Sequence, residues 1–285
     1  MSQVFLNGDY MPMADAKISP MDRGFLFGDG IYEVIPCYDK KLVGFKPHIA
    51  RLTDGLAALE IANPYTEQQW RDICLTLADQ NPEPNLGIYL HVSRGTDSKR
   101  YHAYPDDIKP TVYAFTFEVP TPPVADISKA KAYKVALEQD LRWQHCNIKS
   151  TALLGNVMHF QQGYKKGLNE TILYNQQDEI TEASSSNVFI VEGNTIKTPP
   201  LDNQLLPGIT RLLVLKVLRQ FSEFDVQEVT FTKETLLAAD EVWITSSTKE
   251  IAPVIEVGGH AIGDGTIGKV WLAAQALFSQ YKFEE

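Results

Sequence analysis

The sequence contains few cysteines and no long apolar run. Its three cysteines, Cys37, Cys74 and Cys146, show no CxxC spacing, and their odd number predicts reduced thiols rather than a disulfide framework. No apolar stretch reaches the length needed to cross a bilayer, and the first residues, MSQVFLNGDY, lack the basic and apolar regions of a secretion signal. We therefore expect a cytoplasmic protein that does not reside in a membrane.

Positive charge is also scarce. The 26 Lys and Arg are outnumbered by 36 Asp and Glu, which gives a net charge of -10 and a pI near 5.1. Binding to nucleic acid or to an anionic membrane needs concentrated positive charge, so neither partner is expected. An anionic ligand must instead be bound in a local pocket. The chain shows no internal repeat and no low-complexity tract, and no metal site is expected.

The length and composition favour two domains. A chain of 285 residues with 44% hydrophobic content can bury a large core. In the first part, the strand-like runs VFLNGDY, GIYEVIPCY and TVYAFTFEV alternate with a helical stretch around HIARLTDGLAALEI. The three prolines of EVPTPPVADISKA fix φ and remove backbone donors, which indicates a linker. We therefore predict a small α+β domain at residues 1–120 and a larger domain at residues 121–285.

The pattern beyond this linker is that of an α/β domain. Strands are predicted at KAYKVAL, ETILYN, SNVFIVEG and NTIKTP, and a helix that ends at a glycine is predicted at ALLGNVMHFQQGYKKG. A strongly apolar helix is predicted at ITRLLVLKVLRQF, starting on the glycine turn LPGIT. The run KETLLAADEVWITSST predicts a helix followed by a strand.

One lysine is a candidate for covalent chemistry. In the segment RWQHCNIKS, Lys149 lies between apolar Ile148 and small Ser150 at the entry to a predicted helix, where partial desolvation is expected. Desolvation lowers the pKa of an amine, and an amine that has lost its proton can form a Schiff base with an aldehyde. Taken alone, a lysine is more often a solvated surface residue. The other motifs must therefore decide between the two interpretations.

Two further segments offer a carboxylate and an anion site. TEASSSNVF supplies Glu182, three serines and Asn187 directly before a predicted buried strand. LLPGITRLL places Gly208, Ile209 and Thr210 at a predicted helix start, where free backbone amides and the helix dipole favour a phosphate. Each segment is also compatible with an ordinary polar turn.

Hydroxyl groups and an arginine could complete the same anion site. WITSSTKE places Ser246 and Ser247 at the end of a predicted strand, and HIARL contributes Arg51, whose guanidinium can make charge-assisted hydrogen bonds. A serine cluster is usually only a turn, and a helix arginine is usually solvated. These motifs therefore support an anion site only when they are considered together.

As a set, these segments resemble the class IV family of pyridoxal-5'-phosphate (PLP) enzymes. This family includes D-amino-acid transaminases, branched-chain aminotransferases and aminodeoxychorismate lyases. The resemblance covers nearly the whole chain, from FLNGDY through SPMDRGFLFGDGIYEV, HIARL, IKS, GNVM, TEASSSNVF and LPGITR to ITSSTKEIAPV, in family order. It implies the two-domain α+β / α/β fold of these enzymes, with PLP as cofactor.

The resemblance assigns roles to the motifs. Lys149 resembles the Schiff-base lysine that also carries the proton, and Glu182 resembles the acid that keeps the PLP pyridine nitrogen protonated. Leu206 would pack behind the ring. The implied cofactor-binding residues, which include a phosphate site at Arg51, Ile209, Thr210 and Ser247, are Arg51, Lys149, Glu182, Ser185, Ser186, Asn187, Leu206, Gly208, Ile209, Thr210, Ser246 and Ser247.

The substrate side resembles that of the D-amino-acid transaminases. RGTDSKRYH contains Arg100 and His102, which resemble the RxH pair that binds the substrate α-carboxylate in that subfamily, with Tyr32 of GDGIYEV completing the site. In the subfamily this loop reaches across from the neighbouring subunit, so a homodimer with shared active sites is implied. A fork of arginine donors can hold a carboxylate in one orientation, and this orientation selects the enantiomer.

The expected activity is transfer of the amino group of a D-amino acid, such as D-alanine or D-glutamate, to a 2-oxo acid such as 2-oxoglutarate. Pro207 in LPGITR and the segment GNVM are similar to branched-chain enzymes instead, which leaves an L-branched-chain aminotransferase as the alternative. Two less favoured interpretations are an aminodeoxychorismate lyase and a catalytically silent PLP-fold protein. The RxH pair favours the D-specific function, because its side chains would contact the substrate itself.

Overall fold

The computed structural model describes residues 3–283, which form two compact units. The first comprises residues 3–121 together with Ile148–Leu153, and the second comprises Pro122–Asn147 together with residues 154–283. The segment that contains Lys149 therefore packs with the first unit, although it follows the proline-rich segment in sequence. The domain limits 1–120 and 121–285 stay a prediction.

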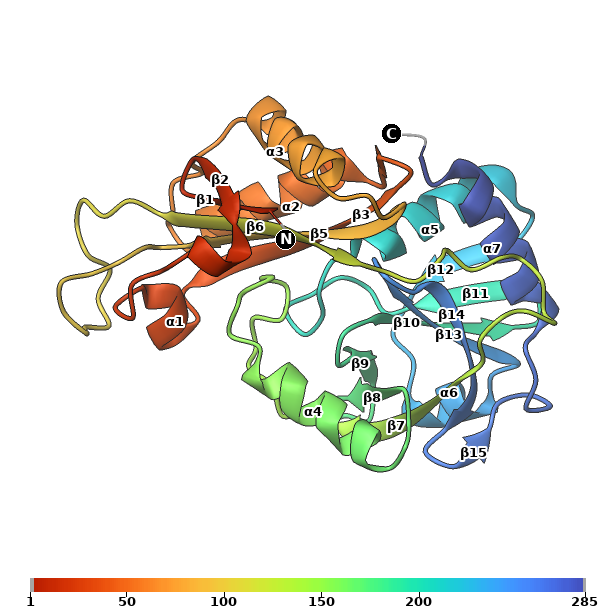
Figure 1. The fold of residues 1–285 in the computed structure, drawn as a ribbon. Coiled ribbons are helices and arrows are strands. Elements are labelled where there is room, and N and C mark those ends of the chain that lie inside the picture. Colours follow the sequence, from red (N-terminus) through yellow and green to blue (C-terminus); the bar gives the residue numbers. More distant parts are fainter. Residues whose placement is uncertain (1–2, 284–285) are drawn as a thin grey trace. The chain divides into compact units, whose positions relative to one another are not determined.

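The first unit is built on a six-stranded antiparallel sheet in the order β2-β1-β6-β5-β3-β4. Two helices, α2 and α3, cover one face of this sheet (Figure 1). The elements are β1 (Gln3–Leu6), β2 (Asp9–Pro12), a 3-10 turn (Met13–Asp15), α1 (Arg23–Phe27), β3 (Gly30–Tyr38), β4 (Lys41–Leu42), α2 (Phe45–Ala58), α3 (Glu67–Asp79), β5 (Asn85–Ser93) and β6 (Thr111–Glu118).

The first residues of β3 alternate between the two faces of the sheet, one covered by α2 and the other only partly buried. Ile31 and Ile35 are fully buried toward α2, whereas Tyr32 points to the other face of the sheet and is half-buried. In α2, Leu52 and Leu56 are fully buried one helical turn apart in the same core. Each such side chain contributes about 1.5–3 kcal/mol by leaving water. The helix thereby fixes which face of β3 remains available for a site.

The N-terminal strand prediction was wrong in one respect. VFLNGDY is not one strand but a hairpin, because Asn7 and Gly8 adopt positive φ values of 53° and 109° and turn the chain between β1 and β2. An Asn-Gly pair is the strongest short-range signal for such a turn. The predicted helix around HIARLTDGLAALEI is confirmed as α2, although it begins earlier, at Phe45, and Ile61 lies beyond its end.

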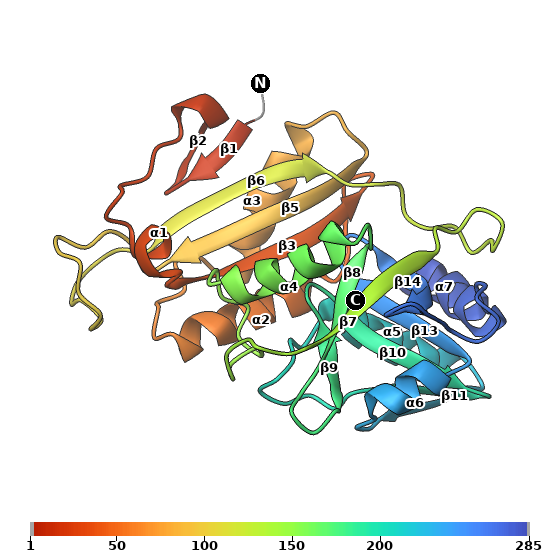
Figure 2. The same ribbon diagram turned by 90° about the horizontal axis from the view of Figure 1, so that it is seen from below.

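The second unit is built on a nine-stranded mixed sheet in the order β12-β11-β10-β13-β14-β7-β8-β9, with β15 paired to β14. Helices α5 and α7 lie side by side (Figure 2), and the rings of Phe221 and Tyr281 stack at 3.8 Å near their C-terminal ends. The elements are β7 (Tyr133–Gln139), α4 (Leu154–Lys165), β8 (Glu170–Tyr174), β9 (Ile180–Ala183), β10 (Asn187–Glu192), β11 (Thr195–Thr198), α5 (Ile209–Phe221), β12 (Asp225–Glu228), α6 (Lys233–Ala238), β13 (Glu241–Ser246), β14 (Glu250–Val257), β15 (His260–Ala261) and α7 (Lys269–Tyr281).

Within residues 3–283, no helix combines the length and the apolar character that crossing a membrane would require. The three cysteines are buried free thiols.

Candidate active site

In the first unit, the segment Ile148–Leu153 lies alongside the beginning of β3. The amide of Tyr32 donates to the carbonyl of Lys149 at 3.1 Å, and the amide of Thr151 donates to the carbonyl of Gly30 at 2.9 Å. The Nζ atom of Lys149 lies 4.2 Å from the centroid of the Tyr32 ring. The structure therefore brings together two of the predicted residues, Lys149 and Tyr32. Lys149 precedes the first residue of α4, Leu154, by a short non-helical stretch.

A glycine turn explains how this segment can approach β3 so closely. Gly28 has a φ of 68°, and a Cβ atom there would lie 2.9 Å from the Cα of Ala152. Both observations require glycine, because an L side chain would be strained and would collide with backbone. The hydroxyl of Thr151 also donates to the carbonyl of Gly28 at 3.0 Å. The GDG motif thus holds the backbone that directly follows Lys149.

Arg51 is held by the buried carboxylate of Glu33, for which the sequence motifs predicted no role. Its Nε and Nη2 atoms donate to the two oxygens of Glu33, each at 2.7 Å, and Nδ1 of His48 lies 2.7 Å from Oε2 of Glu33. Burial alone would raise the pKa of Glu33, but Arg51 and His48 outweigh it and lower this pKa to about 2. Burial lowers the pKa of His48, against the opposing effect of Glu33. Glu33 is therefore anionic at neutral pH and orients Arg51.

The predicted substrate residues Arg100 and His102 lie on the exposed loop of residues 94–110. The guanidinium of Arg100 lies 5.1 Å from the centroid of the Phe27 ring, and the His102 ring lies 5.3 Å from the same centroid. Tyr32 stacks on Tyr89 instead, at 5.7 Å. Within the described part of the chain, Arg100 and His102 each lie against the Phe27 ring, and neither makes a hydrogen bond, an ion pair or a ring contact with Tyr32.

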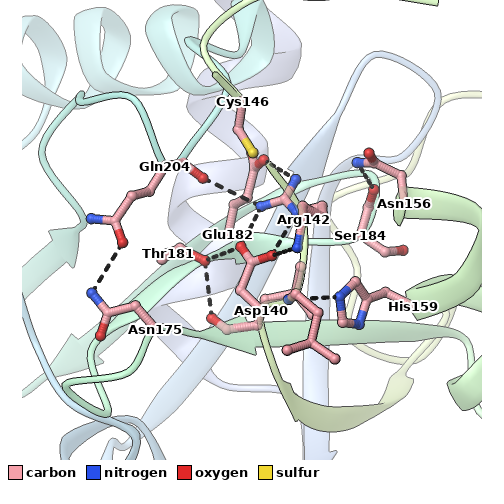
Figure 3. A network of polar contacts seen from close by, with 12 residues as sticks. Asp140, Arg142, Cys146, Asn156, His159, Asn175, Thr181, Glu182, Ser184 and Gln204 are labelled. Carbon is pink, nitrogen blue, oxygen red and sulfur yellow. Dashed lines mark hydrogen bonds and ion pairs between the residues drawn. The ribbon is translucent and has the colours of Figure 1, made fainter. Parts of the chain in front are cut away.

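In the second unit, Glu182 is the centre of a buried polar network (Figure 3). Arg142 donates to its Oε1 at 2.6 Å, the amide of Leu206 donates to its Oε2 at 3.0 Å, and the Asn187 amide group lies 3.3 Å from Oε2. Arg142 is in turn bound by Asp140 through its Nε and Nη2 atoms, at 3.0 and 2.7 Å. The predicted residues Glu182, Asn187 and Leu206 are therefore in direct contact.

Burial raises the pKa of Glu182 to about 7, although Arg142 and the Leu206 amide act in the opposite direction. A carboxylate of this kind binds a proton far more readily than an exposed one. It matches a weakly basic aromatic nitrogen, because the two groups can share one proton as an ion pair in a dry environment. The chemistry of Glu182 thus fits a protonated pyridine ring.

The start of α5 provides donors for an anion. Gly208 is the N-cap residue, and among residues 3–283 no side chain caps the helix, so the first amides, including those of Ile209 and Thr210, have no side-chain acceptor at this end. In the part of the chain that the structure describes, the buried hydroxyl oxygens of Ser186 and Ser246 have no hydrogen-bond partner. Buried hydroxyls without partners are rare, and a phosphate would satisfy them.

A second glycine keeps this helix start close to the carboxylate network. A Cβ atom at Gly208 would lie 1.9 Å from the side-chain oxygen of Asn187. Asn187 also donates to the carbonyl of Leu206 at 2.9 Å, so its side chain is fixed between the Glu182 network and the helix. Helix α5 packs against β13, which ends at Ser246, with Ser247 half-buried in the following turn.

Ser185 differs from its neighbours because its hydroxyl is already engaged. It donates to Oε2 of fully buried Glu170 at 2.5 Å, and Nζ of Lys249 lies 3.5 Å from the same hydroxyl. The hydroxyl of Ser184 also donates to Glu170. Among the serines of TEASSSNVF, Ser184 and Ser185 are therefore bound to Glu170, whereas the hydroxyl of Ser186 has no partner among the described residues.

A cavity of about 320 Å³ opens elsewhere in the first unit, between the 3-10 turn, α1 and the sheet. Its lining surface is mainly apolar, and its polar residues are Asp22, His91, Ser93, Thr111 and Tyr113. None of the predicted site residues lines it. His91 is bonded through Nδ1 to the hydroxyl of Tyr89 at 3.1 Å.

The sequence motifs predicted no role for Glu33, His48 and Arg142, which contact and orient the predicted residues. For Glu33 a signal existed, since an acid stands in the apolar run GIYEVIPCY at a position that alternation places on the buried face. Arg142 lies within RWQHCNIKS but is 40 residues from Glu182 in sequence, so its pairing depends on the fold.

Comparison with known proteins gives consistent results. The family model described as amino-transferase class IV matches residues 30–257. A D-alanine aminotransferase of Staphylococcus haemolyticus is 36% identical over 99% of this chain and 98% of its own length. A D-alanine aminotransferase of Listeria monocytogenes is 34% identical over 99% of this chain and 96% of its own length.

Solved structures show the same fold at lower identity. The branched-chain amino acid aminotransferase from Escherichia coli has a TM-score of 0.87 at 23% identity and covers 98% of this chain and 93% of its own. The branched-chain aminotransferase from Thermoproteus uzoniensis, solved with norvaline, has a TM-score of 0.84 at 22% identity and covers 99% and 94%. The expected two-domain α+β / α/β fold of the class IV enzymes is thereby confirmed.

Proposed function

The chain belongs to the class IV aminotransferases, and we propose that it transfers the amino group of a D-amino acid, such as D-alanine or D-glutamate, to a 2-oxo acid such as 2-oxoglutarate. Enzymes of this family use PLP. The observation that carries the proposal is the 36% identity, over nearly the full length, to a D-alanine aminotransferase. The solved branched-chain enzymes are more distant, and their likeness supports the fold alone.

When bound, PLP supplies an electron sink that stabilises negative charge at the substrate Cα. Lys149 would bind the cofactor covalently through Nζ and then, released by the substrate, would move the proton from Cα to the cofactor. The ring of Tyr32, 4.2 Å from Nζ, and the hydrogen bond from its amide to the Lys149 carbonyl support this role by limiting where the amine can point.

Glu182 would hold the proton of the pyridine nitrogen. Its burial and its pKa near 7 support this role, because an anionic Glu182 is stabilised in the dry site by a ring cation. Arg142 fixes the carboxylate at 2.6 Å and leaves it one orientation. Leu206 and Asn187 bind the same carboxylate oxygen, which supports their assignment to the cofactor site.

The phosphate would be held by the start of α5 and by hydroxyls. The unpartnered hydroxyls of Ser186 and Ser246 and the amides that follow Gly208 support this part of the proposal. Arg51 and Ser247 complete the proposed set. Because Glu33 already orients Arg51, this guanidinium would present a fixed donor rather than a flexible one.

The α-carboxylate of the substrate would be bound by Tyr32, Arg100 and His102. In the proposed homodimer, the loop of Arg100 and His102 serves the neighbouring active site. Exposed apolar side chains along α4 support a partner surface, namely Leu154, Val157, Met158 and Tyr164, which are 58–73% exposed.

We also propose a cytoplasmic location, where the free thiols of Cys37, Cys74 and Cys146 stay reduced.

A single-turnover absorbance experiment tests the proposal. The enzyme loaded with PLP is mixed with D-alanine or L-leucine without an amino acceptor, and conversion of the cofactor to its amine form is followed. We expect conversion with D-alanine at a rate at least about a hundredfold above that with L-leucine. Faster conversion with L-leucine would instead identify an L-branched-chain enzyme.

Lys149→Ala is the matched control. This variant should show no conversion with either amino acid, and borohydride reduction of the parent enzyme followed by peptide mapping should label position 149. A label on any other residue would refute the assignment of the lysine.

A further inference from the structure

The loop of residues 94–110 is held by a buried arginine that no motif singled out. Loops longer than about 12–15 residues without secondary structure are uncommon in compact domains unless they serve a function. This loop joins β5 to β6 beside α1 (Figure 1) and exposes Arg100 and His102. Its exposed tip is expected to be mobile unless something binds its backbone.

Arg23, the first residue of α1, binds that backbone. It is 3% exposed, and its Nη1 donates to the carbonyl of Tyr101 at 2.6 Å and to that of Ala103 at 3.3 Å. Its Nη2 donates to the carbonyl of His102 at 3.2 Å. A planar guanidinium thereby contacts three successive carbonyls, which fixes the path of the chain on both sides of His102.

Asp29 holds Arg23 in place and links it to the lysine segment. Its Oδ2 accepts from Nε of Arg23 at 2.8 Å and from Nε of Arg94 at 2.8 Å. Asp29 lies between Gly28 and Gly30, the residues whose carbonyls accept hydrogen bonds from Thr151, two positions after Lys149. One short turn therefore supports both the loop and the backbone around Lys149.

The side chains of Arg100 and His102 both pack against the ring of Phe27. The centroid of the Phe27 ring lies 4.9 Å from Cζ of Arg23 and 5.1 Å from Cζ of Arg100. It lies 5.3 Å from the centroid of the His102 ring. At the base of the loop, Asp22 accepts from the hydroxyls of Ser93 at 2.7 Å and Thr111 at 2.6 Å, which ties the two ends together. The loop is anchored at its tip and its base.

We propose that Arg23, oriented by Asp29, is a positioning residue that holds Arg100 and His102 in the conformation that binds the substrate carboxylate. This inference rests on the proposed function of that pair. Without Arg23, the loop would have to be ordered each time a carboxylate binds, and this entropy cost weakens binding. The chemical step at Lys149 does not use the loop, so the effect should fall on KM rather than on kcat.

The test compares Arg23→Ala, Arg23→Lys, Arg100→Ala and the double variant Arg23→Ala/Arg100→Ala. KM and kcat are measured for D-alanine and for 2-oxoglutarate, and calorimetry measures the Kd of propionate, a carboxylate that lacks the reacting amine. We expect Arg23→Ala to raise both KM values and the propionate Kd about tenfold, with kcat within about twofold of the parent. Arg23→Lys, which keeps the charge but not the fork, should restore part of the affinity.

The double variant separates positioning from a general loss of stability. If Arg23 acts through Arg100 and His102, then Arg23→Ala should raise the propionate Kd by a smaller factor in the Arg100→Ala background than in the parent, because only His102 is then left to be positioned. The control is Asn63→Ala, in the same unit, which removes the hydrogen bond from the Trp70 indole at 3.1 Å and touches no residue of the loop. It should lower the melting temperature without changing either KM.

Two outcomes would overturn the inference: an unchanged propionate Kd in Arg23→Ala, or independent, multiplying effects in the double variant. Failure of the proposed function looks different, since the parent enzyme itself would then convert no D-amino acid. In that case a non-additive loss of propionate affinity would still support a carboxylate site positioned by Arg23.

Discussion

Replacement of Glu33 by glutamine should reduce the pH dependence of the free energy of unfolding. Glu33 is fully buried, and its carboxylate is bound by Arg51 and His48. Glutamine keeps the size and one acceptor but removes the charge. Arg51 would then lose the anion that compensates it, which is strongly destabilising for a buried partner.

The magnitude follows from the lowered pKa. The folded-state pKa of Glu33 is about 2, below the ordinary value of 4.5, so its contribution to stability is complete above pH 4.5 and is lost as the pH falls through 2. Each pH unit is worth about 1.4 kcal/mol, so the contribution is about 3 kcal/mol in the free energy of unfolding. We therefore expect Glu33→Gln to be about 3 kcal/mol less stable at pH 7 and to approach the parent near pH 2.

Urea unfolding at a series of pH values between 7 and 2.5 measures this difference. The control is Glu228→Gln in the second unit, because Glu228 also accepts from two arginines, Arg211 and Arg219, but its side chain is 31% exposed. Solvent screens that carboxylate, so its substitution should give a smaller pH-dependent difference. A Glu33→Gln difference that stays constant from pH 7 to pH 2.5 would refute the reasoning, since it would not come from the carboxylate charge.

Two further substitutions test the second unit. Glu182→Gln should slow proton abstraction from D-alanine in stopped-flow experiments by at least about a hundredfold while weakening PLP binding less than about tenfold, and unchanged turnover would contradict its role. Gly208→Ala should lower the PLP affinity and destabilise the protein by about 1–3 kcal/mol, because its Cβ would lie 1.9 Å from the side-chain oxygen of Asn187. PLP titration and thermal unfolding measure both effects, and parent-like values in both would show that Asn187 moves aside freely.

Strong local patterns predicted the fold where one face of an element is buried. GIYEVIPCY and ITRLLVLKVLRQF correspond to β3 and α5 as the structure has them. Helix α3 was not predicted, although Thr66 and Gln69 form a capping box and Trp70, Ile73 and Leu77 recur at helical spacing. Sheet order could not be predicted at all, because pairings such as β1 with β6 join segments more than a hundred residues apart.

The site divides in the same way. The motifs LLPGITRLL and WITSSTKE predicted Gly208 at a helix start and Ser246 at a strand end, and the structure has both residues there. Arg142 could not be assigned, because it lies in a loop, its partner Glu182 lies on β9, and only tertiary packing brings the two within 2.6 Å. The contacts of Arg23 could not be predicted for the same reason, since it donates to the carbonyls of a loop about 80 residues away in sequence.

The two buried carboxylates show how one chain separates two tasks that need opposite electrostatics. Glu33 meets two nitrogen partners whose attraction exceeds the cost of burial, so it stays anionic and can only orient Arg51. Glu182 meets a single arginine that is itself shared with Asp140, so burial prevails and its pKa rises to about 7. Carboxylates whose environments move their pKa values apart are suited to different roles. The difference in pKa therefore supports the proposal that Glu33 orients Arg51 and that Glu182 pairs with the pyridine nitrogen of the cofactor.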